Sequence, residues 1–167
     1  DSGAAGMGLG FGAVAAAAAA GRGEDLAGVR AAAETAFERT TTLFYVDTLE
    51  FMRRGGRIGA TQAAVGTALS VKPILGMQDG AVVPLEKVRT SSRAIARVVE
   101  RAAEAVGEST VDIAVQHAAA PERASALMDA LVGRLAVREK YVGEVGAVLA
   151  AHSGPGLVSA VLHRVVP

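Results

Sequence analysis

The sequence predicts an α/β fold in which helices cover a mixed β-sheet, preceded by two helices that have no strand of their own. From residue 41 onward, short apolar runs rich in β-branched residues alternate with longer stretches whose apolar residues recur at helical spacing. Some neighbouring runs are joined by tight turns and others by helices, which is typical of a sheet with antiparallel and parallel pairs. The 167 residues contain no internal repeat and suit one domain, or one domain with part of another.

Two helices are expected before residue 40, at residues 7–21 and 24–39. The apolar residues of the second recur at helical spacing: Leu26, Val29, Ala33 and Phe37. Acidic residues open this helix and Arg39 closes it, as the helix dipole favours. Because no strand adjoins either helix, both are expected to form a layer or domain separate from the sheet.

Between residues 41 and 106, turn residues separate the expected elements. The Gly55-Gly56 pair ends a short helix, and Asp79-Gly80 supplies a hairpin turn because this pair tolerates positive φ. The elements expected in order are a strand at 43–46, helices at 48–53 and 58–69, strands at 71–77 and 81–88, and an amphipathic helix at 91–106.

After residue 110, the pattern predicts one more helix and four strands. Pro121 suits the first turn of a helix, where its missing N–H costs nothing. Gly154-Pro155-Gly156 is expected to be a sharp turn between the last two strands. The elements expected are a strand at 111–116, a helix at 121–137, strands at 140–145 and 147–152, and a final strand at 158–165.

The composition excludes several classes of function. The 17 basic and 17 acidic residues balance, whereas a nucleic-acid surface needs a basic excess. The absence of cysteine excludes disulfides, a thiol nucleophile and a zinc–thiolate site, and it fits a reducing cytoplasm. The hydrophobic fraction of 51% includes 36 alanines, which indicates helices of small residues rather than a membrane protein.

The first residues of the chain carry three signals. Residues 2–21 are uncharged and about as long as a bilayer span, but Gly and Ala dominate them, so a transmembrane helix is disfavoured. The chain opens with Asp1, so we expect a processed chain or a fragment. Gly8, Gly10 and Ala13 fit a dinucleotide-binding pattern, but no strand precedes them. A close approach of helix and backbone explains the glycines more simply.

Two basic segments are candidate anion sites. Three arginines, Arg53, Arg54 and Arg57, surround the glycine pair, and arginine binds carboxylates and phosphates with two hydrogen bonds. A solvated loop at a helix end explains them equally well. Arg89 precedes the start of an expected helix, where an anion would be favoured, although Thr90 or Ser91 as a helix cap is the simpler reading.

His152 is the sharpest local feature. It is expected to end an apolar strand just before the rigid Gly-Pro-Gly turn, and its ring can donate a hydrogen bond to a carboxylate. A hydrolase would use Ser153 as nucleophile, but Ser153 lies in no nucleophile elbow and no acid partner is evident. His117, His152 and His163 are too scattered for a metal motif, so no metal site is expected.

Five segments in the same order resemble the DegV family of bacterial proteins. They are Asp1-Ser2 with Met7–Gly10, Phe44–Ile58, Lys72–Leu75, Lys87–Thr90 and His152–Gly156. The resemblance spans nearly the whole chain and implies a DegV-like C-terminal domain at 41–167, preceded at 1–40 by two helices left from the N-terminal domain. The family's N-terminal threonine and serine motifs are absent. Residues 3–6, where many relatives carry serines, are Gly-Ala-Ala-Gly.

The DegV resemblance implies a non-catalytic protein that binds a long-chain fatty acid between two domains and presents its carboxylate to a fatty acid kinase. It implies no cofactor besides this ligand. His152, Ser153 and Gly154 are the expected carboxylate ligands, and Arg54, Arg57 and Arg89 match the basic residues that contact the kinase. Without the N-terminal motifs, this chain is expected to lack about half of the head-group site.

A buried acyl tail gains roughly 0.8 kcal/mol per methylene, so the ligand needs an apolar tunnel. Candidate tunnel residues are Ile58, Val65, Leu69, Ile74 and Leu75, although ordinary core is the favoured explanation for any one of them. Two other functions remain open: an enzyme that acts on a lipid or acyl phosphate with His152 as base, and an interaction module without ligand.

Overall fold

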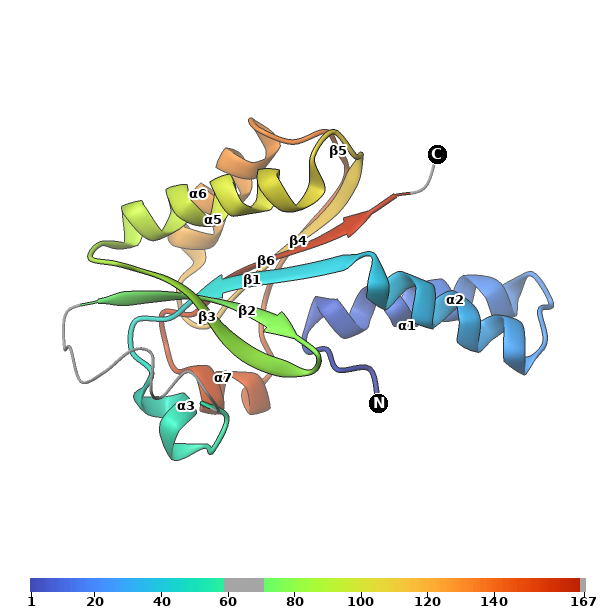
Figure 1. The fold of residues 1–167 in the computed structure, drawn as a ribbon, viewed down its shortest axis with the longest axis horizontal. Coiled ribbons are helices and arrows are strands. Elements are labelled where there is room, and N and C mark those ends of the chain that lie inside the picture. The colour runs from blue at the N-terminus through green and yellow to red at the C-terminus, as the bar shows by residue number, and fades with distance from the viewer. Residues whose placement is uncertain (59–70, 166–167) are drawn as a thin grey trace.

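The computed structural model describes residues 1–58 and 71–165 and contains a six-stranded sheet with helices on both faces (Figure 1). The elements are α1 (Met7–Gly21), α2 (Leu26–Glu38), β1 (Thr40–Tyr45), α3 (Glu50–Arg54), β2 (Lys72–Gln78), β3 (Ala81–Val88), α5 (Ser91–Val106), β4 (Val111–His117), α6 (Pro121–Val132), β5 (Val137–Glu144), α7 (Ala147–Ser153) and β6 (Val158–Arg164). The strand order is β3-β2-β1-β6-β4-β5, with β4 and β5 parallel and the other neighbours antiparallel. The predicted α/β fold with a mixed sheet is confirmed.

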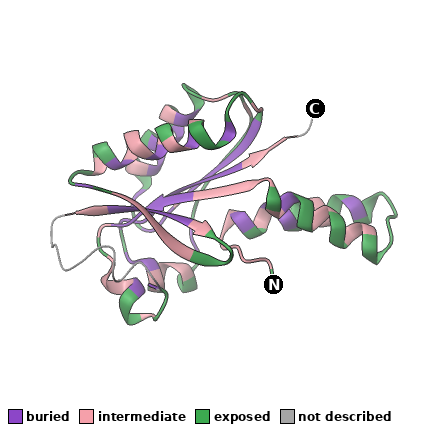
Figure 2. Cartoon of the chain, in the orientation of Figure 1, coloured by how far each residue is buried: buried purple, intermediate pink, exposed green. Residues whose placement is uncertain are grey.

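The larger core lies between one face of the sheet and the helices α5 and α6. The hydroxyl of Thr90 caps α5 by accepting a hydrogen bond from the amide of Arg93. Every fourth residue of α5 is then buried: Ala94, Val98, Ala102 and Val106. This apolar stripe faces the central strands, of which β4 and β6 are buried along most of their length (Figure 2).

The opposite face of the sheet holds two smaller clusters. Side chains alternate along β1, so Leu43 and Tyr45 join the larger core while Phe44 points to the opposite face. There, α3 and α7 cover a cluster that contains Phe44 and Met52. The helix α1 covers another through Phe11. The sheet face between these two clusters is the place where a site can form.

The helices α1 and α2 form a hairpin that projects beside the sheet (Figure 1). The Gly-rich run lies inside α1, and a Cβ atom at Gly12 would collide with the ring of Phe37 on α2. Gly12 therefore permits close packing of the two helices. Gly8 and Gly10 lie within α1 and form no dinucleotide-binding turn. Leu26, expected on the apolar face of α2, is instead exposed.

One predicted strand is wrong. Residues 147–152 form the helix α7, so His152 lies in the last helical turn and does not end a strand. An apolar run of this length does not distinguish strand from helix by periodicity, and its three alanines favour helix. The helix expected at 121–137 ends at Val132, before Gly133. The helix expected at 58–69 falls almost wholly outside the described residues.

No helix among the described residues is long and apolar enough to cross a membrane. The helix α1, which covers most of the uncharged N-terminal segment, has 15 residues.

Candidate functional site

An open cleft of about 580 Å³ lies on the sheet face opposite α5 and α6. Its lining is mostly apolar, with Thr42 and Phe44 of β1 and Met77 of β2 among the floor residues. The helices α3 and α7 contribute one wall, and the segment before α1 contributes another. Other lining residues include Ala5, Met52, Arg57, Gln116, Leu149, His152, Ser153 and Val161.

His152 lies in this cleft, on the last turn of α7, and its ring is partly exposed. A Cβ atom at Gly55 would collide with Nδ1 of the His152 ring, so the ring rests directly on the backbone of Gly55. No hydrogen bond joins the ring to any residue in 1–58 or 71–165. The imidazole is therefore positioned by packing and free to bind a ligand atom.

Two of the sequence segments that resembled the DegV family pack against each other. A Cβ atom at Gly154 would collide with the ring of Phe51, and one at Gly156 would collide with the carboxylate of Asp47. Asp47, Phe51 and Gly55 are four residues apart around α3. They contact Gly156, Gly154 and His152 respectively, which are two residues apart. Both Gly154 (φ 76°) and Gly156 (φ 91°) adopt positive φ, which favours glycine.

A polar network lies under this turn. The carboxylate of Asp47 accepts hydrogen bonds from Lys72 Nζ at 2.8 Å and from Arg123 Nη1 at 2.9 Å. Burial alone would raise the pKa of Asp47, but the hydrogen bonds from the two cations outweigh burial and lower the pKa below its usual value. Lys72 and Arg123 therefore stabilise the ionised form of the Asp47 side chain.

The depressed pKa of Asp47 predicts an acid-sensitive contribution to stability. This contribution is complete above the unfolded pKa of about 3.9 and is lost as the pH falls through the lower folded pKa. We expect the melting temperature of the wild-type protein to fall more steeply in acid than that of Asp47→Asn. Thermal unfolding at several pH values between roughly 6 and 2 measures this difference. Parallel curves for the two proteins would contradict it.

Ser153 and Gly154 do not aim their donors into the cleft. The hydroxyl of Ser153 donates to the carbonyl of Leu149 at 2.8 Å, and the amide of Gly154 donates to the carbonyl of Ala150 at 2.8 Å. Both bonds continue the hydrogen bonding of α7. Of the three residues expected at the carboxylate, His152 is thus the one whose donor is not already used within the described residues.

The expected tunnel residues are spread over several places. Ile58 and Leu75 are buried in the cluster under α3 and α7, beside Phe44 and Met52, and do not line the cleft. Ile74 lies on the other face, in the larger core. Val65 and Leu69 lie outside the described residues. The cleft is lined instead by residues such as Met77, Leu149 and Val161.

The three arginines expected to contact a partner are not equivalent. Arg57 lines the cleft, and Arg54 is held by Glu50 of the same helix, with Nε and Oε1 2.7 Å apart. Hydrogen bonds from Arg53 and then Arg54 lower the pKa of Glu50 to about 2. Arg89 is exposed in the connection between β3 and α5. Of the three arginines, Arg57 is therefore the one that lines the same cleft as His152.

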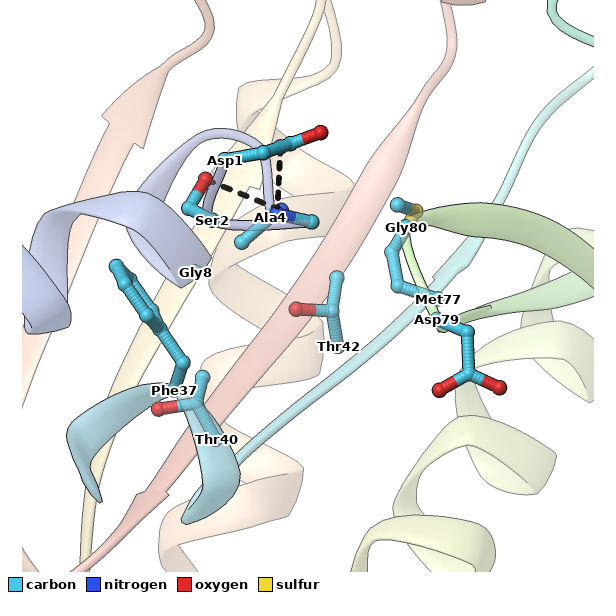
Figure 3. A pocket seen from close by; sticks show the side chains of 11 residues that line it. Asp1, Ser2, Ala4, Gly8, Phe37, Thr40, Thr42, Met77, Asp79 and Gly80 are labelled. Carbon is cyan, nitrogen blue, oxygen red and sulfur yellow. Dashed lines mark hydrogen bonds between the residues drawn. The ribbon is translucent and has the colours of Figure 1, made fainter. Parts of the chain in front are cut away.

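Polar residues that sequence analysis missed also line the cleft. Gln116 accepts a hydrogen bond from the amide of Met7 at 2.7 Å through Oε1, which ties the start of α1 to β4. Thr42 and Met77 also line a second cleft of about 450 Å³, shown in Figure 3 beside Thr40 and Asp79. The first strand was predicted to begin at residue 43, whereas β1 begins at Thr40. In a strand that begins at Thr40, side-chain alternation places Thr40, Thr42 and Phe44 on one face.

The geometry gives little support to hydrolysis at His152. The neighbouring Ser153 is buried and its hydroxyl donates a hydrogen bond to the backbone carbonyl of Leu149, so within the described residues it is not paired with the imidazole. The same residues contain no group of three or more His, Cys, Asp or Glu side chains suited to a metal ion. The arrangement favours binding of an apolar molecule with one polar end.

Known proteins share this sequence and fold. Residues 1–164 match the family described as "Uncharacterised protein, DegV family". A DegV domain-containing protein of Streptomyces coelicolor is 56% identical over 132 residues, which are 78% of this chain and 47% of that protein. The chain spans about half the length of the curated relatives that it matches.

The solved structures that resemble this chain include DegV proteins described as binding fatty acids. A DegV family protein from Thermus thermophilus, described by its fatty acid binding, superposes with a TM-score of 0.91 at 31% identity, over 99% of this chain and 60% of that chain. DegV from Bacillus subtilis, described as a fatty acid binding protein, superposes with a TM-score of 0.85 at 32% identity, over 99% of this chain and 59% of that chain.

Proposed function

Because the chain belongs to the DegV family, we propose that it forms one wall of a binding site for a long-chain fatty acid. The acyl tail lies in the apolar cleft, and the carboxylate meets the imidazole of His152. The observation that carries this proposal is an apolar cleft with a histidine on its wall whose ring has no other hydrogen-bond partner among the described residues.

The two ends of a fatty acid need different surroundings. Each buried methylene of the tail contributes about 0.8 kcal/mol to binding. The apolar lining of the cleft, which includes Met52 and Val161, provides that burial. The carboxylate is costly to bury unless donors surround it. His152 supplies one such donor, and Arg57 brings a positive charge to the same cleft.

We propose that the remaining carboxylate donors come from the part of DegV proteins that lies outside the region matched by these 167 residues. In this division, residues 1–40 belong with an N-terminal domain and residues 41–167 form the C-terminal domain. The site then lies between the two domains. The expected consequence is that the chain alone binds a fatty acid weakly.

The role that we propose is presentation of the bound acid to a kinase subunit in the cytoplasm, without catalysis by this chain. Arg57 is the best-placed contact for such a partner, because it is exposed and lines the cleft beside His152. Arg54 and Arg89 are further candidates, both exposed. Charge reversal at Arg57 should weaken the association with the kinase more than charge reversal at Arg89.

Filling the cleft tests whether it holds the tail. We expect Ala5→Phe to reduce fatty-acid binding strongly, because Ala5 lines the cleft and the larger ring occupies the space of the tail. Ala18→Phe is the matched control, since Ala18 is exposed on α1 and lines neither cleft. Binding is measured on delipidated protein by native mass spectrometry, and the melting temperature of each variant is recorded.

Fatty-acid binding, kinase binding and acyl phosphate turnover together separate the rival functions. Fatty-acid binding that Ala5→Phe leaves unchanged would show that the tail lies elsewhere. A wild-type protein that binds a kinase but no fatty acid would favour the interaction module. Turnover of an acyl phosphate that disappears in His152→Ala would favour the enzyme.

A further inference from the structure

Asp47 lies outside the cleft, yet its carboxylate touches the turn that follows His152. The oxygen Oδ2 lies 2.2 Å from the position that a Cβ atom of Gly156 would take. The same carboxylate pairs with Lys72 at the start of β2 and with Arg123 in the first turn of α6, and Nη2 of Arg123 also lies against Gly156. One acidic group therefore connects the turn to two elements of the rigid core.

The turn is also held by its backbone. The amide of Gly156 donates to the carbonyl of Ala118 at 2.7 Å, and the amide of Ala118 donates to the carbonyl of Leu157 at 3.1 Å. These bonds fix the end of the turn against the end of β4. Its start, Gly154, is covered by Phe51. Between these anchors, Gly156 lies against the ion pair of Asp47 and Arg123, and this is the contact that depends on charge.

We propose that Asp47 is a positioning residue for His152: its ion pairs with Lys72 and Arg123 hold the Gly154-Pro155-Gly156 turn and so aim the imidazole into the cleft. The proposal rests on the proposed function, in which that imidazole binds the carboxylate. It explains why three separated sequence segments, those of Asp47, Lys72 and His152, meet at one place.

The charge on Asp47 is the property that the proposal requires. In Asp47→Asn the side chain keeps its shape, but Lys72 and Arg123 are left close together without a counter-charge. Their repulsion displaces the group that supports Gly156. The turn then relaxes, and the His152 ring leaves its seat on Gly55.

The matched control is Asp112→Asn. Asp112 is a buried carboxylate that pairs with Arg138, so this variant also removes one side of an Asp–Arg ion pair. Asp112 lies on β4 and lines neither cleft. General destabilisation therefore affects both variants, whereas loss of His152 positioning affects Asp47→Asn alone.

The experiment combines two measurements on each variant. The ring signals of His152, identified by their absence in His152→Ala, are recorded by NMR at one fixed pH without ligand. Fatty-acid affinity is then measured with palmitate. We expect Asp47→Asn to shift the His152 signals and to weaken palmitate binding roughly tenfold, as when one hydrogen-bond donor moves out of reach. Asp112→Asn should change neither.

Unchanged His152 signals in a folded Asp47→Asn protein would overturn the proposal. Equal shifts in Asp112→Asn would overturn it as well. If Asp47→Asn does not fold, Arg123→Lys replaces it, because lysine loses the second contact that Arg123 makes with Oδ2 at 3.3 Å while keeping the charge. A wild-type protein that binds no palmitate refutes the proposed function, but the NMR signals still decide the role of Asp47.

Discussion

His152→Ala is expected to weaken fatty-acid binding by roughly tenfold to a hundredfold. The reason is the loss of a hydrogen bond to a charged group, which contributes about 1.5 to 3 kcal/mol. The side chain lines the cleft with its ring seated on Gly55, and no described residue competes for its hydrogen bonds. The dissociation constant for palmitate, measured on delipidated protein, gives the result.

His152→Gln is the matched control for this first prediction. Glutamine keeps an N–H donor of similar reach, so it should retain part of the affinity that alanine loses. Wild-type affinity in His152→Ala would show that the carboxylate is bound elsewhere, for example near Thr42 and Gln116 on the sheet that forms the floor of the cleft.

Gly154→Ala is expected to destabilise the protein by roughly 2 to 5 kcal/mol, a large share of a typical folding free energy. Two costs combine at this position. A residue other than glycine at φ 76° is strained, and the new methyl group collides with the ring of Phe51. Urea unfolding measures the loss.

Gly107→Ala isolates the first cost, the backbone strain. Gly107 also has positive φ, at 57°, but no atom lies within 4 Å of the position that its Cβ would take. This control should lose only about 1 to 2 kcal/mol, the cost of backbone strain. Equal losses at Gly154 and Gly107 would mean that α3 does not hold the turn. A variant of Gly154 that stays folded should also bind palmitate more weakly, because the turn adjoins His152.

Local signals in the sequence were enough for much of the fold. The Asp79-Gly80 turn lies between β2 and β3 as predicted, with positive φ at both residues. The predicted helix at 91–106 has the bounds of α5, because an apolar stripe of helical period and a threonine cap are both local features. The strand predicted at 147–152 is wrong because the apolar residues of this run show no clear period.

The candidate site could be predicted only in part. His152 stood out because a rigid glycine-proline turn follows it, and the structure places it in a cleft. Its support by Gly55, about a hundred positions earlier in the chain, has no signal in a single sequence. Ile74 was predicted to line the tunnel, but it faces the larger core. An apolar residue of a strand can face either side of the sheet, and the sequence did not determine which.

The sequence by itself determined the α/β class, most of the helices and strands, and the short list of residues with chemistry to offer. Those properties depend on period, turn residues and charge, which are written locally along the chain. Only the tertiary structure decided that Asp47, Phe51 and Gly55 lie against the turn at Gly154-Pro155-Gly156 and the imidazole before it. That decision belongs to packing between distant segments, where the fit of a carboxylate or a ring against a glycine depends on contacts that no local pattern encodes.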